Sequence, residues 1–362
     1  MKSKSIYLLI TLFYFTLSCS TNNLEEETTG KTLGFKTTLA KELVLPIGIT
    51  NINDSYQPFG SNSVFFLNEH SKTLYELDLI KNKIDSISTL DSLTFFDGFI
   101  VEPKSKLAYI FYHDKVQIYA FNGELKRIID LATTCDTSTY LTVLNQTYLP
   151  HIYDNSIFIQ SFPAFEESYT NPLFFQEPIM KSFNLQSMDC QTTKAFYPSN
   201  YQQNCYGVNY IPEKVVLENK LGHKIGFTYA YNDSVFIYDA DLESTQAKFF
   251  GSKMHTSIVK QLPFDKIDQY NQSVLDDLYA VNPHYAFTKS FPLAGFVGRS
   301  LLVKNGSKIT EFLCLYDDKF EYLGESNGIW KSNILCDSEQ GVKSIQLRTK
   351  EKRLIINDVT WE

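Results

Sequence analysis

Residues Lys115 to Leu131 read KVQIYAFNGELKRIIDL, in which two runs of alternating apolar and polar residues are separated by Asn122-Gly123. Alternation with a period of two is typical of a half-buried β-strand. Asn-Gly between two such runs is typical of a tight hairpin turn, because both residues tolerate a positive φ. The stretch therefore predicts two antiparallel strands joined by a short turn.

The same unit recurs along most of the chain. Each copy has a strand, a turn centred on Asp or Asn, and a second strand, and most copies have a further strand upstream. The other copies are Thr73–Ile87, Ile179–Cys190, Val235–Phe250 and Phe312–Gly324, with turn centres Asp78, Asn184, Asp239 and Asp317. A sixth hairpin, Val342 to Trp361, keeps the alternation but has Arg348 to Lys352 at its turn.

Units of three or four short antiparallel strands, repeated at roughly 40 to 50 residues, are typical of a β-propeller. We therefore predict an all-β fold, a six-bladed β-propeller with loop and short-helix inserts. Seven blades, or a two-domain β-sandwich, are the alternatives. The strand around Glu42 to Ile49 is expected to complete the blade that ends at Trp361, so that no sheet edge stays open.

Two inserts interrupt the repeats. The first, Ala164 to Pro178, reads as a polar and aromatic loop. The second, Lys253 to Tyr285, contains apolar residues between Ile267 and Leu278 at the spacing of a short amphipathic helix. The aromatic side chains in and near the inserts have two interpretations. They stack on a sugar or a protein partner, or they pack the inserts onto the propeller.

The composition predicts a folded chain without a nucleic-acid partner. Of 362 residues, 43% are hydrophobic and 20% are charged, which is enough apolar surface for a core. The net charge of -8 and the lack of a Lys/Arg-rich run argue against binding to nucleic acid. The sequence contains no G-x-S-x-G, H-E-x-x-H, P-loop or dinucleotide motif and no zinc-type Cys/His cluster. We therefore expect no metal, no cofactor, and a binding protein rather than an enzyme.

The N-terminus has the layout of an export signal. Two lysines precede an apolar stretch from Ile6 to Leu17, and Cys19 follows it. The stretch is shorter than the roughly 20 residues of a transmembrane helix. Cys19 in this position resembles the acylated cysteine of a bacterial lipoprotein; the alternative is an ordinary signal peptide. We predict a lipoprotein signal peptide at residues 1–18, a flexible tether at 19–34 and the propeller at 35–362, with acyl chains on Cys19 holding the protein at a membrane.

The lipoprotein-like start, the size and several segments resemble Bacteroidetes lipoproteins of the six-bladed propeller type, specifically the DUF4221 family. The segments are the hairpins YELDL, IYAFNGEL and FIYDADLE and the stretch NPHYAFTKSFPLAGFVGRSLLV. The resemblance covers about Phe35 to Glu362 and implies a fold and a place in the cell envelope, as an outer-membrane lipoprotein that is periplasmic or surface-exposed. In that family a Tyr-rich strand ends in Arg at the position of Arg299, whereas here Val297 and Gly298 precede it.

Four residues are candidates for ligand binding. His113 ends a predicted strand, His284 and Tyr285 follow the predicted helix of the second insert, and Arg299 comes later in the same stretch. Imidazole can exchange protons near neutral pH, and a guanidinium can hold an anion. The function we expect is a lipid-anchored propeller that presents a binding site to an unidentified protein or glycan ligand. The alternative is a carbohydrate-active hydrolase or lyase with its site in the propeller channel.

Five cysteines remain beyond Cys19. Export permits disulfides, and a turn-rich stretch separates Cys190 from Cys205. We predict a disulfide between these two residues, with buried free thiols as the alternative.

Overall fold

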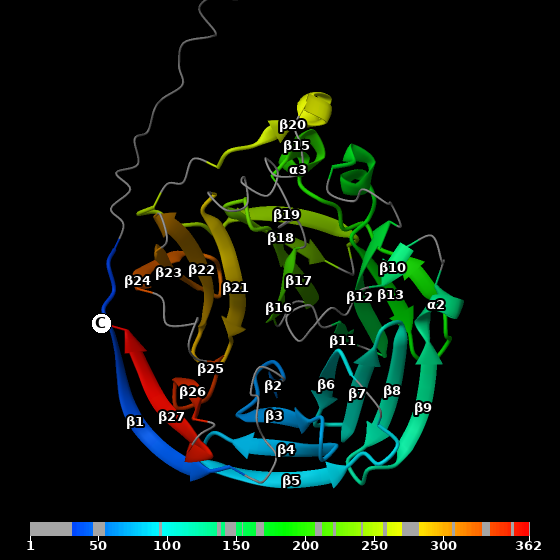
Figure 1. The fold of residues 1–362 in the computed structure, drawn as a ribbon, viewed down its shortest axis with the longest axis vertical. Coiled ribbons are helices and arrows are strands. Elements are labelled where there is room, and N and C mark those ends of the chain that lie inside the picture. The colour runs from blue at the N-terminus through cyan, green and yellow to red at the C-terminus, as the bar shows by residue number, and fades with distance from the viewer. Residues whose placement is uncertain are drawn as a thin grey trace, which may run out of the picture.

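The computed structural model describes most of the chain from residue 31 onward. The described residues are 31–45, 55–93, 96–135, 139–141, 150–153, 155–163, 170–206, 212–219, 222–239, 242–255, 259–269, 282–305, 308–327, 334–348 and 351–361. Six antiparallel sheets stand around a central axis like the blades of a propeller (Figure 1). The predicted six-bladed propeller is therefore confirmed.

Each blade has four main strands, named here from the axis outward. Blade 1 contains β2 (Ser55–Tyr56), β3 (Ser63–Asn68), β4 (Thr73–Asp78) and β5 (Lys83–Thr89). Blade 2 contains β6 (Gly98–Glu102), β7 (Leu107–Tyr112), β8 (Lys115–Ala120) and β9 (Leu125–Asp130). Blade 3 contains β11 (His151–Tyr153), β12 (Ser156–Pro163), β13 (Met180–Asn184) and β14 (Cys190–Thr192), and β10 (Thr139–Leu141) also pairs with β12. Blade 4 contains β16 (Glu213–Asn219), β17 (Gly222–Thr228), β18 (Ser234–Asp239) and β19 (Ser244–Phe249). Blade 5 contains β21 (His284–Phe291), β22 (Phe296–Asn305), β23 (Lys308–Asp317) and β24 (Tyr322–Asn327). Blade 6 contains β25 (Ile334–Cys336), β26 (Val342–Arg348), β27 (Arg353–Trp361) and β1 (Phe35–Val44).

The ring is closed by its first strand. β1 pairs antiparallel with β27, with Phe35 opposite Trp361 and Val44 opposite Arg353. The predicted closure between the two ends of the chain is confirmed, although the strand begins earlier than the expected Glu42. Residues 46–49 of that prediction lie outside the described part of the chain. Closure joins the ends of the chain in one sheet, so the last blade does not depend on C-terminal strands alone.

The Asp and Asn residues at the predicted turn centres hold the hairpins together. Asp78 Oδ1 accepts the backbone N–H groups of Ile80 and Lys81 at 2.9 and 2.8 Å. The turn centres of the four other predicted copies accept backbone N–H groups in the same way: Asn122, Asn184, Asp239 and Asp317. A short side-chain oxygen that satisfies turn amides is the physical reason for this residue choice.

The hydrophobic core lies between neighbouring blades. In one such layer, Phe66 and Tyr75 of blade 1 belong to the same buried cluster as Ile345 and Ile356 of blade 6. Similar clusters join blade 1 to blade 2 and blade 2 to blade 3. Because each blade is covered on both faces, the inner strands are held firmly around the axis.

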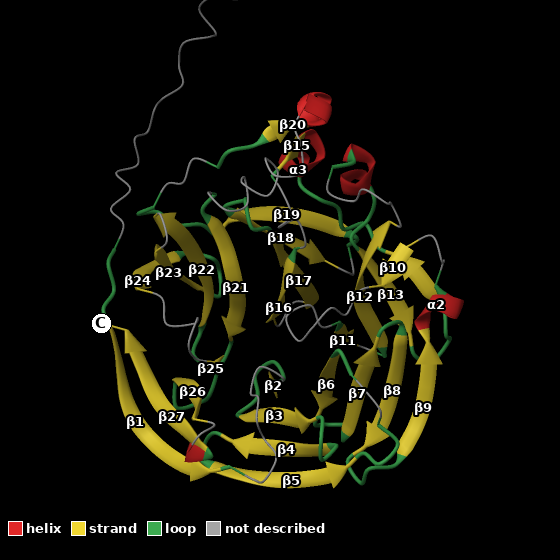
Figure 2. Cartoon of the chain, viewed as in Figure 1, coloured by secondary structure: helices red, strands yellow, loops and turns green. Residues whose placement is uncertain are grey.

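The short helices lie at the rim of the ring (Figure 2). They are α2 (Leu131–Thr134), α3 (Ser199–Gln203), η2 (Pro172–Gln176) and η3 (Phe264–Gln269); the small strands β15 (Asn204–Cys205) and β20 (Leu262–Pro263) lie beside α3 and η3. Of the predicted amphipathic helix, η3 is the described portion, and residues 270–281 lie outside the described part. Among the described helices, none is long and apolar enough to cross a membrane.

Most of the described insert aromatics are packing residues. Phe174, Phe175, Tyr197, Tyr201 and Tyr206 are all buried, in one cluster with residues of blades 3 and 4. The second interpretation of these aromatics is therefore the correct one, because burial of large rings fixes the inserts to the propeller.

The predicted disulfide is wrong in one partner. Cys190 is bonded to Cys135, with 5.2 Å between their Cα atoms, whereas the buried Cys205 is in no disulfide and packs against Leu262 and Phe264. Cys135 follows α2 at the outer edge of blade 2, and Cys190 begins the outer strand of blade 3. Neighbouring blades bring these distant residues together, so closeness in the sequence was a poor guide.

Candidate functional site

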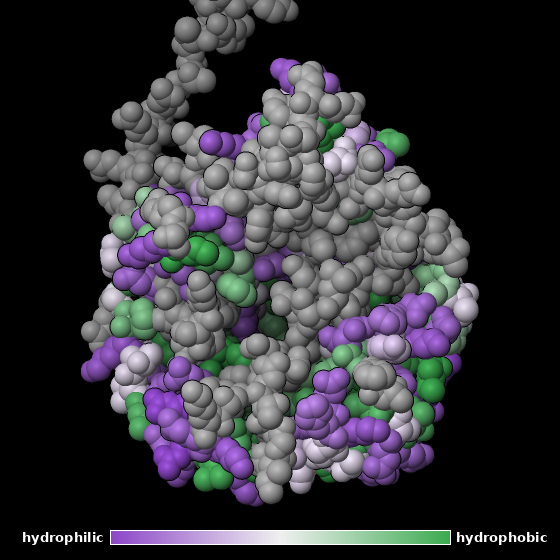
Figure 3. Space-filling view, in the orientation of Figure 1, coloured by the Kyte–Doolittle hydropathy of each residue, from purple (hydrophilic) through white to green (hydrophobic). Residues whose placement is uncertain are grey.

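A cavity of about 230 Å³ lies on the axis of the ring, among the inner strands. In Figure 3 the centre of the ring is hollowed, and both hydrophilic and hydrophobic residues are seen at its wall. The cavity is lined by Ser55, Tyr56, Gln57, Pro58, Phe59, Gly60, Pro150, His151, Lys214, Val215, Val216, Thr288, Lys289, Ser290, Pro292 and Asp337. Five of the six blades contribute to this wall, so a ligand here would contact much of the ring.

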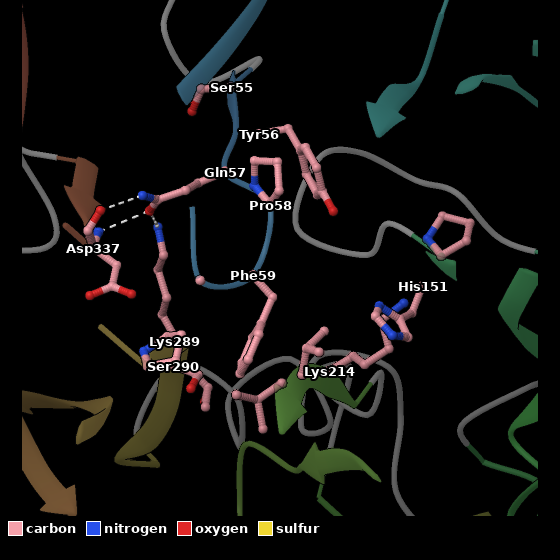
Figure 4. Close-up of a pocket in the computed structure, with 16 residues that line it drawn as sticks. Ser55, Tyr56, Gln57, Pro58, Phe59, His151, Lys214, Lys289, Ser290 and Asp337 are labelled. Atoms are coloured by element: carbon pink, nitrogen blue, oxygen red, sulfur yellow. Dashed lines mark hydrogen bonds between the residues drawn. The ribbon is translucent and has the colours of Figure 1, made fainter. Parts of the chain in front are cut away.

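Lys289 brings a positive charge to the cavity. Its Nζ donates to the backbone oxygen of Leu335 at 2.7 Å and to Gln57 Oε1 at 3.2 Å, and neither oxygen carries a formal charge (Figure 4). Burial lowers the pKa of Lys289, and the neighbouring Cys336 and Asp337 oppose part of that change. The ammonium is therefore solvated by neutral groups at the edge of a cavity.

Gln57 fixes the position of this ammonium. Its amide nitrogen donates to the backbone oxygens of Ser61 and Asp337 at 2.8 and 2.5 Å, and its Oε1 accepts from the N–H of Asp337 at 2.9 Å. Gln57 thus connects blades 1 and 6 by hydrogen bonds, and the hydrogen bond from Lys289 links blade 5 to both. Hydrogen bonds on both ends of the amide leave little freedom for the Lys289 head group.

The two carboxylates next to Lys289 and Lys214 are bound to backbone amides. Asp337 accepts from the N–H groups of Leu293 and Ala294 at 2.8 and 3.0 Å. Burial raises the pKa of the Asp337 carboxyl, while these donors and Lys289 oppose the rise. Both carboxylate oxygens therefore have a structural partner.

The carboxylate of Glu213 also accepts backbone N–H groups, at the joint between blades 4 and 5. Its two oxygens accept the N–H groups of Phe287 and Thr288, both at 2.9 Å. These amides belong to an irregularity of β21, where Phe287 has a φ of 54° and the pairing register with β22 shifts. The carboxylate satisfies amides at the bulge, and it fixes the start of β16 next to the middle of β21.

Lys214 lies at the opposite part of the cavity from Gln57, near His151 in the view of Figure 4. It is the second residue of β16, and Val215 and Val216 follow it. Burial lowers the pKa of Lys214 to about 7. Its amine is therefore present in both protonation states near neutral pH, which is the condition for proton transfer or nucleophilic attack.

The remaining wall is largely apolar. Tyr56 and Phe59 are supplied by β2 and the loop that follows it, and both rings border the cavity (Figure 4). Gly60 has a φ of 63°, a left-handed conformation that glycine adopts without steric cost, and it turns the loop back toward β3. These rings give a ring-shaped ligand aromatic surfaces to pack against.

Two of the predicted ligand residues form a buried structural cluster instead. The Arg299 guanidinium donates to the backbone oxygens of Asn232, Phe250 and Tyr229 at 3.0, 3.2 and 2.7 Å, and the side chain is 1% exposed. The Tyr285 hydroxyl accepts from Ser252 N–H at 2.8 Å, and burial raises the pKa of this phenol. Tyr285 and Arg299 are brought together, but they lie inside the joint between blades 4 and 5.

The two predicted histidines lie elsewhere. His284 Nδ1 is 3.3 Å from the backbone oxygen of Asn282, its ring contacts Tyr231, and burial lowers its pKa. His113 occupies the tight turn between β7 and β8 with a φ of 52° and an exposed side chain. None of the four predicted residues is among the described residues that line the central cavity.

The residues of the cavity have only a weak signature in the sequence. Lys214 and Lys289 are lysines within otherwise apolar or aromatic strands, in IPEKVVL and YAFTKSFP. A lysine at such a position, in the first strand of a repeated unit, would have indicated a polar group facing the axis. Among the described residues, no group of three or more His, Cys, Asp or Glu side chains could hold a metal ion.

Comparison with known proteins identifies the fold. No protein-family model matches the sequence, and no curated protein matches it. The structure is similar to the crystal structure of a DUF4221 family member from Bacteroides vulgatus ATCC 8482, with a TM-score of 0.69 and 14% sequence identity over 91% of this chain and 98% of that chain. The chain has the fold of this DUF4221 protein. The fold that the sequence resemblance implied is thereby confirmed.

A second solved structure agrees with the first. A protein of Bacteroides fragilis NCTC 9343, named as an exported protein, matches with a TM-score of 0.56 and 12% identity over 91% of this chain and 95% of that chain. At these identities the likeness concerns the fold.

Proposed function

We propose that the protein is an exported binding protein whose central cavity holds a small ligand with a carboxylate group and a ring-shaped body. The observation that carries this proposal is the Lys289 ammonium, which faces the cavity while its hydrogen bonds go to the neutral oxygens of Leu335 and Gln57. A partly buried ammonium that is hydrogen-bonded only to neutral oxygens is stabilised further by an anion, which adds a charged hydrogen-bond acceptor.

The other charges of the wall favour a carboxylate over a neutral ligand. The Asp337 carboxylate is bound to the amides of Leu293 and Ala294, which reduces its ability to neutralise Lys289. Ser290, whose side chain carries a hydroxyl group, also lines the cavity next to Lys289 in the sequence. A ligand carboxylate could therefore accept from an ammonium and from neutral donors at once.

The shape of the ligand follows from the apolar wall. Tyr56 and Phe59 provide aromatic faces, and Pro58, Pro150 and Pro292 add aliphatic surface. Such a wall packs against the C–H face of a sugar acid or against an aryl acid equally well. Both share the carboxylate and the ring-shaped body, and a binding experiment can separate them.

Export and anchoring are part of the same proposal. The N-terminal signal layout, with Cys19 after the apolar stretch, lies in the part of the chain outside the described residues. The disulfide between Cys135 and Cys190 is suited to an oxidising compartment, and the Bacteroides fragilis protein of similar fold is named as exported. An acyl anchor at Cys19 would move the protein into the detergent phase of a Triton X-114 extract. Cys19→Ala would return it to the aqueous phase.

The binding proposal is tested with the full chain in detergent by thermal unfolding. Phenyllactate and D-glucuronate represent the two ligand types, and benzyl alcohol and D-glucose are the neutral counterparts. A ligand at 100 times its dissociation constant adds about 2.7 kcal/mol to the free energy of unfolding and should raise the midpoint by roughly 1 °C or more. We expect a shift with at least one carboxylate and none with its neutral counterpart.

A variant in the apolar wall supplies the control. Phe59→Ala removes a ring from the cavity without changing its charge, so it should weaken the effect of the carboxylate that fits best. Equal shifts with charged and neutral compounds, or no shift with either carboxylate at millimolar concentration, would contradict the proposal.

A further inference from the structure

A second cavity lies at the outer edge of the ring, between blades 4 and 5. It has a volume of about 280 Å³, and its wall includes Lys248 of β19, Lys253 of the segment after β19, and Lys319 of the turn between β23 and β24. The rings of Phe320 and Tyr322 also line it. We call this cavity the lysine groove. It shares no described lining residue with the central cavity.

The lysine groove carries a surplus of positive charge. Lys253 Nζ lies 5.2 Å from the ring centroid of Tyr322. Lys248 Nζ lies 5.6 Å from the ring centroid of Phe320 and donates to the backbone oxygen of Lys319 at 3.1 Å. These partners position the ammonium groups but carry no formal charge. Within the described part of the chain, none of the three lysines forms an ion pair, and the groove wall contains a single acid, at position 321.

The N-terminal end of the described chain runs beside this groove (Figure 1). Thr32 forms a parallel bridge with Glu325 of β24, and the backbone oxygen of Lys31 accepts from the N–H of Glu325 at 2.8 Å. Both chains of a parallel pair run in the same direction, so from Thr32 back to Lys31 the chain leads toward Tyr322, a wall residue of the groove. Thr32 Oγ1 also lies 3.7 Å from the sulfur of Met254, which follows a groove lysine. The chain upstream of Lys31 therefore starts next to the lysine groove.

An acidic run comes shortly before this point in the sequence. Residues Glu25, Glu26 and Glu27 lie outside the described part of the chain, and three residues separate Glu27 from Lys31. A chain spans at most about 3.6 Å per residue, so the Cα atoms of Glu27 and Lys31 can be no more than about 14 Å apart. We propose that this run docks in the lysine groove, with its three carboxylates against the three ammonium groups.

Charge and covalent connection both favour this occupant. A single exposed pair of Glu and Lys is weak, but three pairs in one groove act together. A link of three residues also gives the run a high effective concentration at the groove. An anion from solution has to compete with a segment that is tied to the edge of the site. The acidic run is therefore the partner that the groove fits best.

This inference does not depend on a ligand in the central cavity, and it gives the proposed anchor a defined geometry. With the run docked, residues 20–24 alone connect Cys19 to the groove, a span of at most about 22 Å. The edge of blades 4 and 5 is then the part of the ring nearest to the membrane. High salt screens the ion pairs, so it should release the run and lengthen the tether.

Carbodiimide cross-linking of the full chain in detergent tests the docking. The reagent joins a carboxylate to an amine that touches it, and peptide mass spectrometry identifies the two residues. We expect links from the acidic run to the groove lysines to exceed links to Lys36 roughly fivefold or more at about 20 mM salt, and to fall at about 1 M salt. Lys36 is the matched control, because it is exposed on β1 and only five residues from Lys31. The exposed ion pair of Lys194 and Glu243 is the positive control.

Proteolysis supplies a second readout. The protease Glu-C cleaves after glutamate, so docking should slow its cleavage after residues 25–27. Changing Lys248, Lys253 and Lys319 together to Gln should accelerate this cleavage roughly fivefold or more, whereas Lys36→Gln should leave it unchanged. Cys19→Ala should give the same cross-links and the same cleavage as the unmodified chain. Failure of the anchor and failure of the docking are therefore distinguishable.

Three results would overturn the proposal. The first is cross-links spread evenly between the groove lysines and Lys36. The second is cleavage that does not respond to the lysine substitutions. The third is binding of Cys19→Ala to phosphatidylglycerol vesicles that requires the groove lysines, without cross-links from the acidic run. That result would assign the groove to a membrane surface instead.

Discussion

The guanidinium of Arg299 lies 4.0 Å from the ring centroid of Tyr285, and the same guanidinium donates to three backbone oxygens of the neighbouring blade. Both residues were expected at a ligand site, and both instead join blade 4 to blade 5. Stacking on the phenol and a planar fork of donors are properties of Arg that Lys lacks. The arrangement predicts that position 299 controls stability.

Arg299→Met should destabilise the protein by about 3 kcal/mol or more, because it leaves buried backbone oxygens without donors. Urea unfolding of the full chain measures this difference. Arg299→Lys should recover only part of the loss. Arg353, an exposed residue paired with Glu42, is the matched control, and Arg353→Met should change stability by about 0.5 kcal/mol or less. Equal effects at positions 299 and 353 would refute the structural role.

The disulfide predicts a specific pattern of free thiols. Cys135→Ala and Cys190→Ala should each lower the free energy of unfolding by about 4 kcal/mol, the loop-closure value for a separation of 55 residues. The double variant should lose no more than either single variant. Non-reducing peptide maps should show residues 135 and 190 linked and Cys205 alkylated only after unfolding. A linked peptide that contains Cys205 would be inconsistent with the structure.

The carboxylate of Glu213 should hold the bulge of β21 in place. Glu213→Gln keeps the shape but can accept only one of the two N–H groups of Phe287 and Thr288 with oxygen, so we expect a loss of about 1 to 3 kcal/mol. Hydrogen exchange at these two amides should become faster. The exposed Glu124→Gln serves as the control and should leave their exchange unchanged. Unchanged exchange in Glu213→Gln would argue against this role.

The lowered pKa of Lys214 predicts a pH dependence of stability. Its folded value is about 7 against an ordinary value of 10.5, so the unfolded chain binds the proton first as the pH falls from about 10.5 to 7. Burial of the amine therefore costs no stability from this titration above about pH 10.5. The cost grows as the pH falls from about 10.5 and is complete below about pH 7. Lys214→Met removes this titration, so its advantage over the unmodified protein should be greatest near pH 7 and shrink toward pH 10. A difference independent of pH would contradict the assignment.

The sequence was sufficient for the blades because each hairpin repeats a local signal. Asp78, Asn122 and Asp317 satisfy turn amides within a few residues, and the alternation around them follows from burial of one face. The closing strand was predictable from topology, since an open edge is unfavourable. The hairpins depend on residues close together in the chain, and the closing strand follows from the general rule that sheet edges are paired or covered.

The site was not predictable in the same way. The inner strands are short: β2 has two residues and β25 has three, too few to show a period. Gln57, Lys289 and Asp337 meet only because the ring brings blades 1, 5 and 6 to one axis. Tyr285 and Arg299 attracted attention because they are chemically versatile, yet versatility also suits a buried joint between blades. Three-dimensional contact, and not local pattern, decides between these roles.

A thermodynamic cycle at Lys289 tests whether its ammonium holds the carboxylate of a ligand. Calorimetry of the full chain measures the affinity of phenyllactate and of benzyl alcohol for the unmodified protein and for Lys289→Met, with the exposed Lys126→Met as a matched control. If Lys289 holds the carboxylate, its coupling to that group should be about 1.5 to 3 kcal/mol, and Lys126→Met should show none. Should glucuronate prove the better ligand, the same cycle is run with glucuronate and glucose. A coupling near zero in a folded Lys289→Met variant would contradict binding of a ligand carboxylate by Lys289.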